Sequence, residues 1–158
     1  MIKFLWLLFL IIPLFGEDTI YQLPNQHTRF IDQLAKQFKQ SKRILILTPS
    51  FNHHLVEKEI LKQVKRGTSL TLIVHTITTA SRSIVQYEHV DLKISSRPFT
   101  HTIIIVDERY LCTIEGSLDE EIFSSKYMRG HCSDDYEQIS ALRESIAPIL
   151  QNSAFYLK

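Results

Sequence analysis

The chain has 158 residues, 44% of them hydrophobic, with 18 basic and 17 acidic residues, two cysteines and four glycines. This size suits one globular domain and the apolar share can build a core, so the composition excludes a disordered, collagen-like, disulfide-dense or multi-span membrane protein. A net charge of +1 argues against a strongly basic nucleic-acid-binding protein, although a sum of charges can hide an uneven distribution.

The N-terminus has the pattern of an export signal. Lys3 is followed by an apolar run over residues 4–15, and Gly16 closes the run before two acidic residues. The run is shorter than the roughly 20 residues of a membrane span. We therefore expect residues 1–16 to be a signal peptide, with an uncleaved anchor or a buried N-terminal element as alternatives. Residues 17–158 then form a single exported domain that is periplasmic, secreted or membrane-anchored.

Export would place Cys112 and Cys132 in a compartment where a disulfide can persist. A bridge between them would close a loop of about twenty residues, and their spacing fits no zinc-binding pattern. Two buried free cysteines that act as small hydrophobic residues are an equally good interpretation. The sequence therefore leaves the disulfide open.

The first half of the domain alternates between helical and extended patterns. Apolar residues recur at helical spacing over 27–40, and a continuous apolar run over 43–48 suits a strand that is buried on both faces. Asn52 can cap a second amphipathic helix that ends at Gly67, and another apolar strand follows at 70–74. This strand–helix–strand order is a βαβ unit, whose two strands are parallel.

The second half contains shorter elements. Residues 76–87 are polar and form a loop or a short helix, while alternation over 90–94 indicates a strand with one exposed face. Strands over 102–106 and 110–114 are joined by a connection of hairpin length, and a C-terminal helix covers 139–150. We therefore predict a mixed α/β fold with a mostly parallel central sheet flanked by helices.

Four local patterns follow one another in the last two thirds of the chain. They are Ser50-Phe51 ahead of a helix, a Lys65-Arg66-Gly67 turn, Ile103-Ile104-Ile105-Val106-Asp107, and Gly116-Ser117 after a hairpin. In these features residues 41–151 resemble the small single-motif members of the phospholipase D superfamily, exported bacterial endonucleases that pair as homodimers. The resemblance implies a phospholipase D-like fold and a partner subunit, either a second copy or a related chain. We expect no cofactor.

Members of that family carry His-x-Lys-x4-Asp on the first hairpin strand and Gly-Ser-x-Asn after the second. The resemblance implies that the histidine attacks phosphorus, that a partner's histidine protonates the leaving oxygen, and that the lysine and asparagine hold the phosphoryl oxygens. When the first motif is aligned on Asp107, the histidine position is Thr100 and the lysine position is Thr102.

The second motif is kept in part. Gly116 and Ser117 match it, whereas Asp119 stands where the asparagine is expected. The residues at the three changed positions provide neither an activated nucleophile nor a cation, and a neutral or acidic pocket attracts phosphate poorly. The sequence therefore favours a catalytically degenerate domain.

Two histidines are alternatives for a remaining catalytic role. His101 lies six residues before Asp107 rather than seven, and alternation along a strand turns it away from the face of the motif positions. His75 ends a strand at the carboxyl edge of the sheet, where α/β proteins bind ligands. The catalytic candidates are Asp107, Ser117 and His101. The candidate ligand-binding residues are Thr100, Thr102, Gly116, Ser117 and His75.

The other histidines and the acidic residues indicate no metal site. His53 and His54 stand at the start of the second helix, where a neutral or capping histidine is commoner than a ligand. No pair of histidines has the helical spacing with a carboxylate that zinc sites use. Acidic residues 119–121 and 134–135 could bind a divalent cation through oxygen atoms, but solvated surface positions are the commoner interpretation. We predict no metal.

Charge is distributed unevenly along the chain. Between Arg29 and Arg66 nine residues are basic and three are acidic, whereas between Asp107 and Glu144 ten are acidic and four are basic. If both predicted basic helices lie on one face, they offer a surface for nucleic acid or for an anionic membrane. Solvated lysine faces are the alternative. The apolar segment at the N-terminus is a second route to membrane association.

Three functions are consistent with these observations. A degenerate phospholipase D-like domain would bind a partner subunit or a phosphate-containing ligand. An active phosphodiesterase or endonuclease would use His101 or His75. A binding module would hold nucleic acid or anionic lipid through the basic helices of residues 29–66. We favour the first, because the acidic half of the chain coincides with the region that should attract phosphate.

Overall fold

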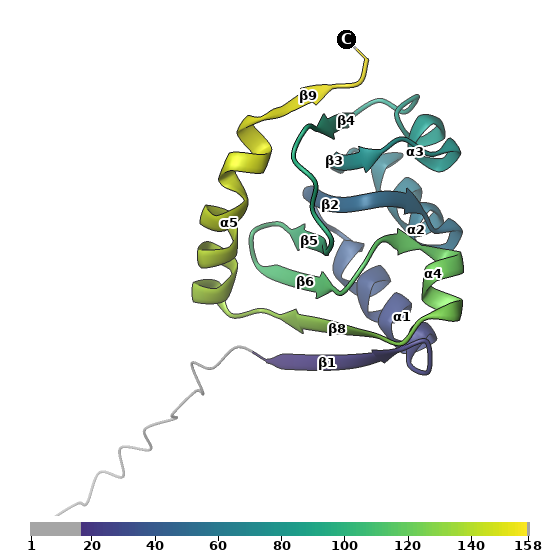
Figure 1. The fold of residues 1–158 in the computed structure, drawn as a ribbon, viewed down its shortest axis with the longest axis vertical. Coiled ribbons are helices and arrows are strands. Elements are labelled where there is room, and N and C mark those ends of the chain that lie inside the picture. Colours follow the sequence, from purple (N-terminus) through teal and green to yellow (C-terminus); the bar gives the residue numbers. More distant parts are fainter. Residues whose placement is uncertain (1–16, 158) are drawn as a thin grey trace, which may run out of the picture.

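The computed structural model describes residues 17–157, which form a nine-stranded sheet with helices on both faces (Figure 1). The strands are β1 (Asp18–Leu23), β2 (Arg43–Asn52), β3 (Ser69–Thr76), β4 (Val90–Ser95), β5 (Thr102–Val106), β6 (Tyr110–Ile114), β7 (Leu118–Asp119), β8 (Met128–Ser133) and β9 (Ser153–Phe155). The helices are α1 (His27–Phe38), α2 (His54–Val64), α3 (Thr79–Ile84), α4 (Glu120–Ser125) and α5 (Tyr136–Gln151). The predicted mixed α/β fold is confirmed. The predicted signal peptide lies outside the described residues.

The sheet is mixed, but most of its pairs are antiparallel. Its strand order is β1-β8-β6-β5-β2-β3-β4-β9, and β7 pairs with the end of β2. Among the described strands, parallel pairing is confined to β2–β3, β3–β4 and β2–β7. The expectation of a mostly parallel sheet is therefore wrong. The βαβ unit is parallel as expected, but the β5–β6 hairpin enters beside β2, and a hairpin imposes antiparallel pairing that β8 and β1 continue.

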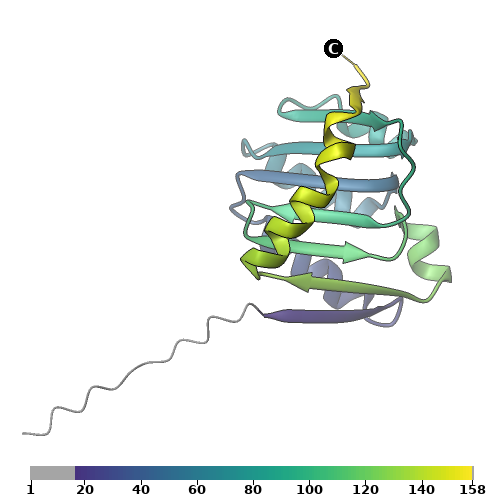
Figure 2. The same ribbon diagram turned by 60° about the vertical axis from the view of Figure 1, so that its left-hand side comes forward.

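Helices cover the two faces of the sheet unequally. On one face α1, α2 and α3 pack over the larger core, while α5 alone runs diagonally across the other (Figure 2). Residues along β5 alternate between these two layers. Ile104 and Val106 belong to the core under α1 and α2, whereas Ile103 and Ile105 pack in the smaller core with Ile139 of α5. Both faces of β5 are therefore buried, as its continuous apolar sequence predicts.

Element ends differ from the sequence-based expectation by a few residues. The α1 stripe of Phe30, Leu34 and Phe38 is buried as predicted. Strand β2 extends to Asn52, so Asn52 does not cap α2; the residue at that position is His53, and its side chain makes no capping hydrogen bond. The extension follows from the pairing of the end of β2 with β7.

Five short elements have no counterpart in the sequence-based expectation: β1, β7, α4, β8 and β9. The polar segment after β3 contains α3, which begins with a reciprocal capping box between Thr78 and Ser81. Helix α5 begins three residues earlier than expected, because Asp135 accepts hydrogen bonds from the backbone N–H groups of Glu137 (2.8 Å) and Gln138 (3.3 Å).

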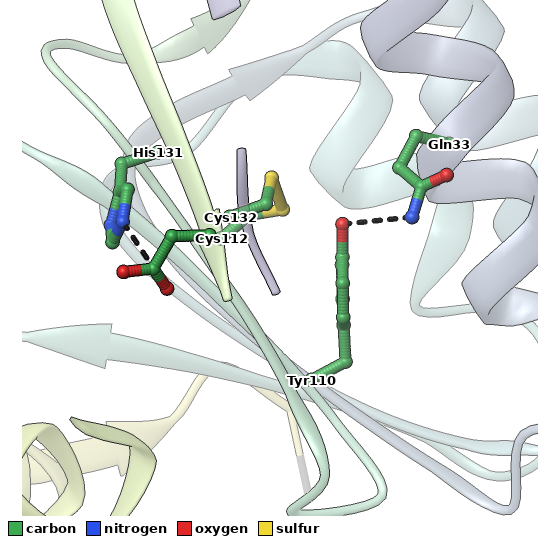
Figure 3. The surroundings of a disulfide bond; sticks show 6 residues. Gln33, Tyr110, Cys112, His131 and Cys132 are labelled. Atoms are coloured by element: carbon green, nitrogen blue, oxygen red, sulfur yellow. Dashed lines mark hydrogen bonds and ion pairs between the residues drawn. A yellow bond between two sulfur atoms is a disulfide. The ribbon is translucent and has the colours of Figure 1, made fainter. Parts of the chain in front are cut away.

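The two cysteines are joined in a disulfide that crosses from β6 to β8 (Figure 3). Cys112 and Cys132 stand directly opposite each other in the antiparallel register, with a Cα–Cα distance of 4.1 Å, and both are buried. The bridge therefore ties β6 of the β5–β6 hairpin to β8, on the side of the sheet that α1 and α2 cover. Among residues 17–157, no helix is long and apolar enough to cross a membrane.

Candidate functional site

The residues singled out from the sequence belong mainly to one edge of the sheet. At this edge the carboxyl ends of the parallel strands β2 and β3 meet the beginning of β5 and the end of β6, because Ser50 pairs with Thr76 and Thr102 pairs with Ile114. We call it the motif edge. It is the edge at which α/β sheets commonly bind ligands.

Thr102, at the lysine position of the first motif, is the centre of a buried hydroxyl network. Its Oγ1 lies 2.8 Å from Oγ1 of Thr48 and 2.6 Å from the carbonyl oxygen of Gly116. Thr48 Oγ1 accepts a hydrogen bond from the backbone N–H of Leu118 at 2.8 Å and lies 2.8 Å from the carbonyl oxygen of Ser50. Both threonine side chains are fully buried.

This network attaches the Gly116–Leu118 loop to β2 and β5 through neutral groups. The two hydroxyls have two protons to donate, and three contacts share them. These are the contact between Thr48 and Thr102 and the contacts with the carbonyl oxygens of Ser50 and Gly116. Thr102 has no solvent access, so a cationic side chain at this position would be a buried charge without a partner, which is strongly destabilising.

Asp107 lies at the opposite end of β5 from Thr102. Its carboxylate oxygen accepts hydrogen bonds from the backbone N–H groups of Lys42 (2.9 Å) and Arg43 (2.8 Å), and Arg109 is 3.8 Å away. These contacts fix the β5–β6 turn to the start of β2. The structure therefore gives Asp107 a structural role and separates it from the motif edge.

Gly116 and Asp119 both have structural roles, one in the loop conformation and the other as a helix cap. Gly116 has φ +135°, and a Cβ there would come within 2.8 Å of Met128 Sδ, so the position requires glycine. Asp119 accepts hydrogen bonds from the N–H groups of Glu121 (3.0 Å) and Ile122 (3.2 Å) and thereby caps α4. The half-buried Ser117 makes no hydrogen bond to another side chain within residues 17–157.

His101 and His75 are exposed at the motif edge. Strand β5 begins only at Thr102, so its alternation does not extend to the two preceding residues, and His101 Nδ1 contacts Thr100 Oγ1 at 2.9 Å. His75 Nδ1 lies 3.2 Å from the carbonyl oxygen of Ser95. The structure gives neither histidine a contact with Ser117.

A cluster of histidines beside the motif edge was not expected from the sequence. Nε2 of His27 lies 3.0 Å from Nε2 of His53, and Nδ1 of His54 contacts the Glu120 carboxylate. His53 is fully buried and its Nδ1 has no partner. Only the fold reveals this cluster, because His27 comes from α1, the adjacent pair from the start of α2, and Glu120 from α4.

Burial controls the titration of the cluster. Desolvation, and secondarily the neighbouring His27, lower the pKa of His53 to about 4. Desolvation also lowers the pKa of His27. The hydrogen bond from His54 lowers the pKa of Glu120. At neutral pH the His27–His53 pair is therefore uncharged, and Glu120 is ionised.

A cavity of about 960 Å³ lies between β1 and α1 and not at the motif edge. Arg29, Asp32 and Lys36 line it, with Tyr110 at its base. Tyr110 accepts a hydrogen bond from Gln33 Nε2 at 3.1 Å, and burial raises its pKa to about 12 (Figure 3). Within residues 17–157, no group of three or more His, Cys, Asp or Glu side chains is arranged to hold a metal ion.

Neither a protein-family model nor a curated protein matches the sequence. Solved structures do match the fold. NucT from Helicobacter pylori superimposes with a TM-score of 0.79 at 13% identity, covering 89% of this chain and 99% of that one. The phospholipase D family member Nuc from Salmonella typhimurium gives a TM-score of 0.73 at 14% identity, covering 90% and 99%. The chain has the phospholipase D-like fold.

A phosphatidylserine synthase from Haemophilus influenzae shares this fold over part of its length. It gives a TM-score of 0.70 at 15% identity and covers 91% of this chain but 40% of its own. The resemblance inferred from the sequence is therefore confirmed for the phospholipase D-like fold.

Proposed function

We propose that this protein is an exported phospholipase D-like domain that does not hydrolyse phosphodiesters and acts by binding a partner subunit or a phosphate-containing ligand. The observation that carries the proposal is the buried position of Thr102, whose hydroxyl contacts Thr48 and Gly116. In the resembled enzymes this position carries the lysine that holds phosphoryl oxygens. Here it is neutral and closed to solvent.

Phosphoryl transfer depends on electrostatic stabilisation and positioning more than on any one covalent contact. Thr100 and Thr102 supply no positive charge, and the Asp119 carboxylate caps α4 rather than facing a ligand as an amide would. A threonine hydroxyl is a poor nucleophile unless a base activates it; His101 Nδ1 lies 2.9 Å from the Thr100 hydroxyl, but no cation stands at either motif threonine to hold the phosphoryl oxygens. The motif edge therefore lacks the groups that the reaction needs, which supports a binding role.

The partner in this proposal is a second copy of the chain or a related chain. The resembled enzymes have one motif per chain and complete their site by pairing. We expect a degenerate chain that keeps the fold to associate in the same way. Analytical ultracentrifugation tests this part of the proposal, with a dimer as the expected species and a monomer at all concentrations as the contrary result.

Catalytic loss is tested by a hydrolysis assay on DNA and on a small bis-phosphodiester. We expect no turnover above the buffer rate. His101→Ala and His75→Ala identify the source of any activity, because these are the exposed imidazoles at the motif edge. Turnover that either substitution removes would support the alternative of an active phosphodiesterase.

A second candidate function is binding of a phosphate-rich polymer or surface through α1 and α2. The two helices pack against each other on one face of the sheet (Figure 1). All nine basic residues between Arg29 and Arg66 are exposed. Within the described chain, ion pairs of these nine are confined to Arg43 with Glu108 and Lys62 with Glu59. The remaining cations make no ion pair and can contact phosphates, although Lys65 also lies 5.6 Å from the centroid of the Tyr87 ring.

Salt dependence tests this second function. Binding to duplex DNA, followed by fluorescence anisotropy, should weaken steeply with salt. K58E/K65E should weaken it further, because Lys58 is exposed on α2 and Lys65 is exposed at the C-terminal cap of that helix. R143E on the opposite face is the matched control. Anionic vesicles in place of DNA distinguish a membrane from nucleic acid as the preferred surface.

A further inference from the structure

Three helices begin at the histidine cluster beside the motif edge. His27 is the first residue of α1, His53 precedes α2, and Glu120 is the first residue of α4. Phe123 of α4 is fully buried against the cluster, with ring centroids 5.0 Å from His53 and 5.7 Å from His27. The two imidazoles, together with Phe30, thus form part of the surface on which α4 packs.

The contact between the two imidazoles depends on their protonation. Their Nε2 atoms are 3.0 Å apart, which is a hydrogen bond when one nitrogen donates and the other accepts. A neutral imidazole supplies one donor and one acceptor, so two neutral rings satisfy the contact. When both rings are protonated there is no acceptor, and two positive charges face each other at hydrogen-bond distance.

Other charged groups around the pair come from two helices. His54 and Glu57 lie on α2, and Glu120 lies on α4. The negative charge of Glu120 favours protonation of both imidazoles, but desolvation opposes it and is the larger effect. The pair is therefore held neutral by burial. Opening to water removes the desolvation and favours the charged rings.

The position of α4 is coupled to the candidate site. Helix α4 follows β7 without an intervening residue, and β7 pairs with Phe51 and Asn52 immediately before His53. The loop at Gly116 is in turn hydrogen-bonded to Thr102. Movement of α4 away from the imidazoles would pull on this connected segment of the motif edge.

We propose that the His27–His53 pair is a proton-operated latch, which holds α4 on the helical layer while both imidazoles are neutral and releases α4 and β7 when they are protonated. The consequence is that mild acid exposes the part of the motif edge formed by residues 116–119. The latch operates whether or not the site is catalytic, so it goes beyond the proposed function.

Amide hydrogen exchange on the full chain tests the latch. The Lys126 N–H, bonded to the Ile122 carbonyl oxygen at 3.0 Å, reports on α4, and the amides of β3 report on the rest of the fold. After division by the intrinsic rate at each pH, α4 should lose about tenfold or more of its protection between about pH 7.5 and about pH 5. Protection of β3 should change by less than about twofold.

Two variants separate titration from packing. His27→Gln keeps an amide that can hydrogen-bond His53 but cannot be protonated, so only His53 can take up a proton on opening, and α4 should lose clearly less protection in mild acid than it does in the unmodified chain. His89→Asn is the matched control, since His89 is exposed at the start of β4 and has φ +66°, a conformation that asparagine tolerates. It should respond to pH as the unmodified chain does.

A pH-independent protection of α4, or an equal response in H27Q and the unmodified chain, would overturn the proposal. If H27Q leaves α4 unprotected even at neutral pH, NMR titration of the two imidazoles in the unmodified chain decides. The latch requires α4 to open over the pH range in which His27 or His53 becomes protonated. Opening outside both ranges contradicts it.

Discussion

The Thr102 hydroxyl lies 2.8 Å from the Thr48 hydroxyl, and both side chains are fully buried between β5 and β2. Through this contact the lysine position of the first motif becomes part of the core. Thr48 also accepts a hydrogen bond from the backbone N–H of Leu118, so the same pair of threonines holds the Gly116–Leu118 loop of the second motif. The motif edge is thus stabilised by Thr48 together with Thr102, the residue that the sequence alignment places at the lysine position.

Thr102→Lys should destabilise the protein and should not create activity. A lysine at this fully buried position has no carboxylate partner among its contacts, so we expect unfolding to become easier by about 3–5 kcal/mol. Urea denaturation followed by far-UV circular dichroism measures the change. Thr113→Lys on β6, where the side chain is half-buried, is the matched control and should cost far less. Equal costs at the two positions would contradict the role of the network.

Thr48→Val tests the network without adding charge. Valine has a similar shape but no hydroxyl, so the Leu118 N–H and the Thr102 hydroxyl lose a partner in a buried setting. We expect a loss of about 1–3 kcal/mol in the free energy of unfolding. Thr71→Val on the half-buried position of β3 provides the comparison and should be nearly neutral.

Stability should fall as the pH is lowered through the histidine range. His53 has a folded-state pKa of about 4, below its unfolded value of about 6.5, so the unfolded chain binds more protons between these limits. The stabilisation from keeping this ring neutral is complete above about pH 6.5 and is lost toward about pH 4, amounting to about 3 kcal/mol. Denaturation midpoints across this range measure it, and His53→Phe should flatten the dependence.

The disulfide should contribute measurably to stability. Cys112 and Cys132 are separated by 20 residues, and a loop of this size corresponds to about 3 kcal/mol of chain-entropy stabilisation. Thiol reductant should therefore lower the thermal midpoint of the unmodified protein. The Cys112→Ala/Cys132→Ala protein should have a lower midpoint that reductant does not change. A midpoint insensitive to reductant in the unmodified chain, with the bridge shown to be reduced, would contradict this contribution.

Periodicity predicted the elements that have long apolar patterns. The stripe of Phe30, Leu34 and Phe38 and the run around Ile46 both lie in the core, because burial and side-chain period are local properties of the sequence. Strand β1 and strand β8 were missed. Their sequences mix polar and apolar residues, as exposed Ile20 and Arg129 illustrate. Strand β8 is held by pairing with β6, to which the disulfide joins it, and β1 by pairing with β8.

The candidate site was predicted in position but not in its contacts. Motif alignment selected Thr102 and Gly116, and the fold joins them by a hydrogen bond. Thr48 was not selected, because nothing in its own sequence context distinguishes a strand threonine that faces β5. The same holds for His27, whose partner His53 is 26 residues away and on a different helix. Such contacts depend on how the helices pack, which local sequence does not specify.

The most direct test of the central claim is phosphodiester hydrolysis by the full chain. Plasmid DNA and a chromogenic bis-phosphodiester are incubated with the unmodified protein, His101→Ala, His75→Ala and His89→Asn, the last being distant from the motif edge. A domain whose phosphate-holding lysine position is the buried Thr102 should give the buffer rate with all four proteins. Hydrolysis by the unmodified protein and by H89N, abolished in H101A or H75A, would contradict a degenerate site.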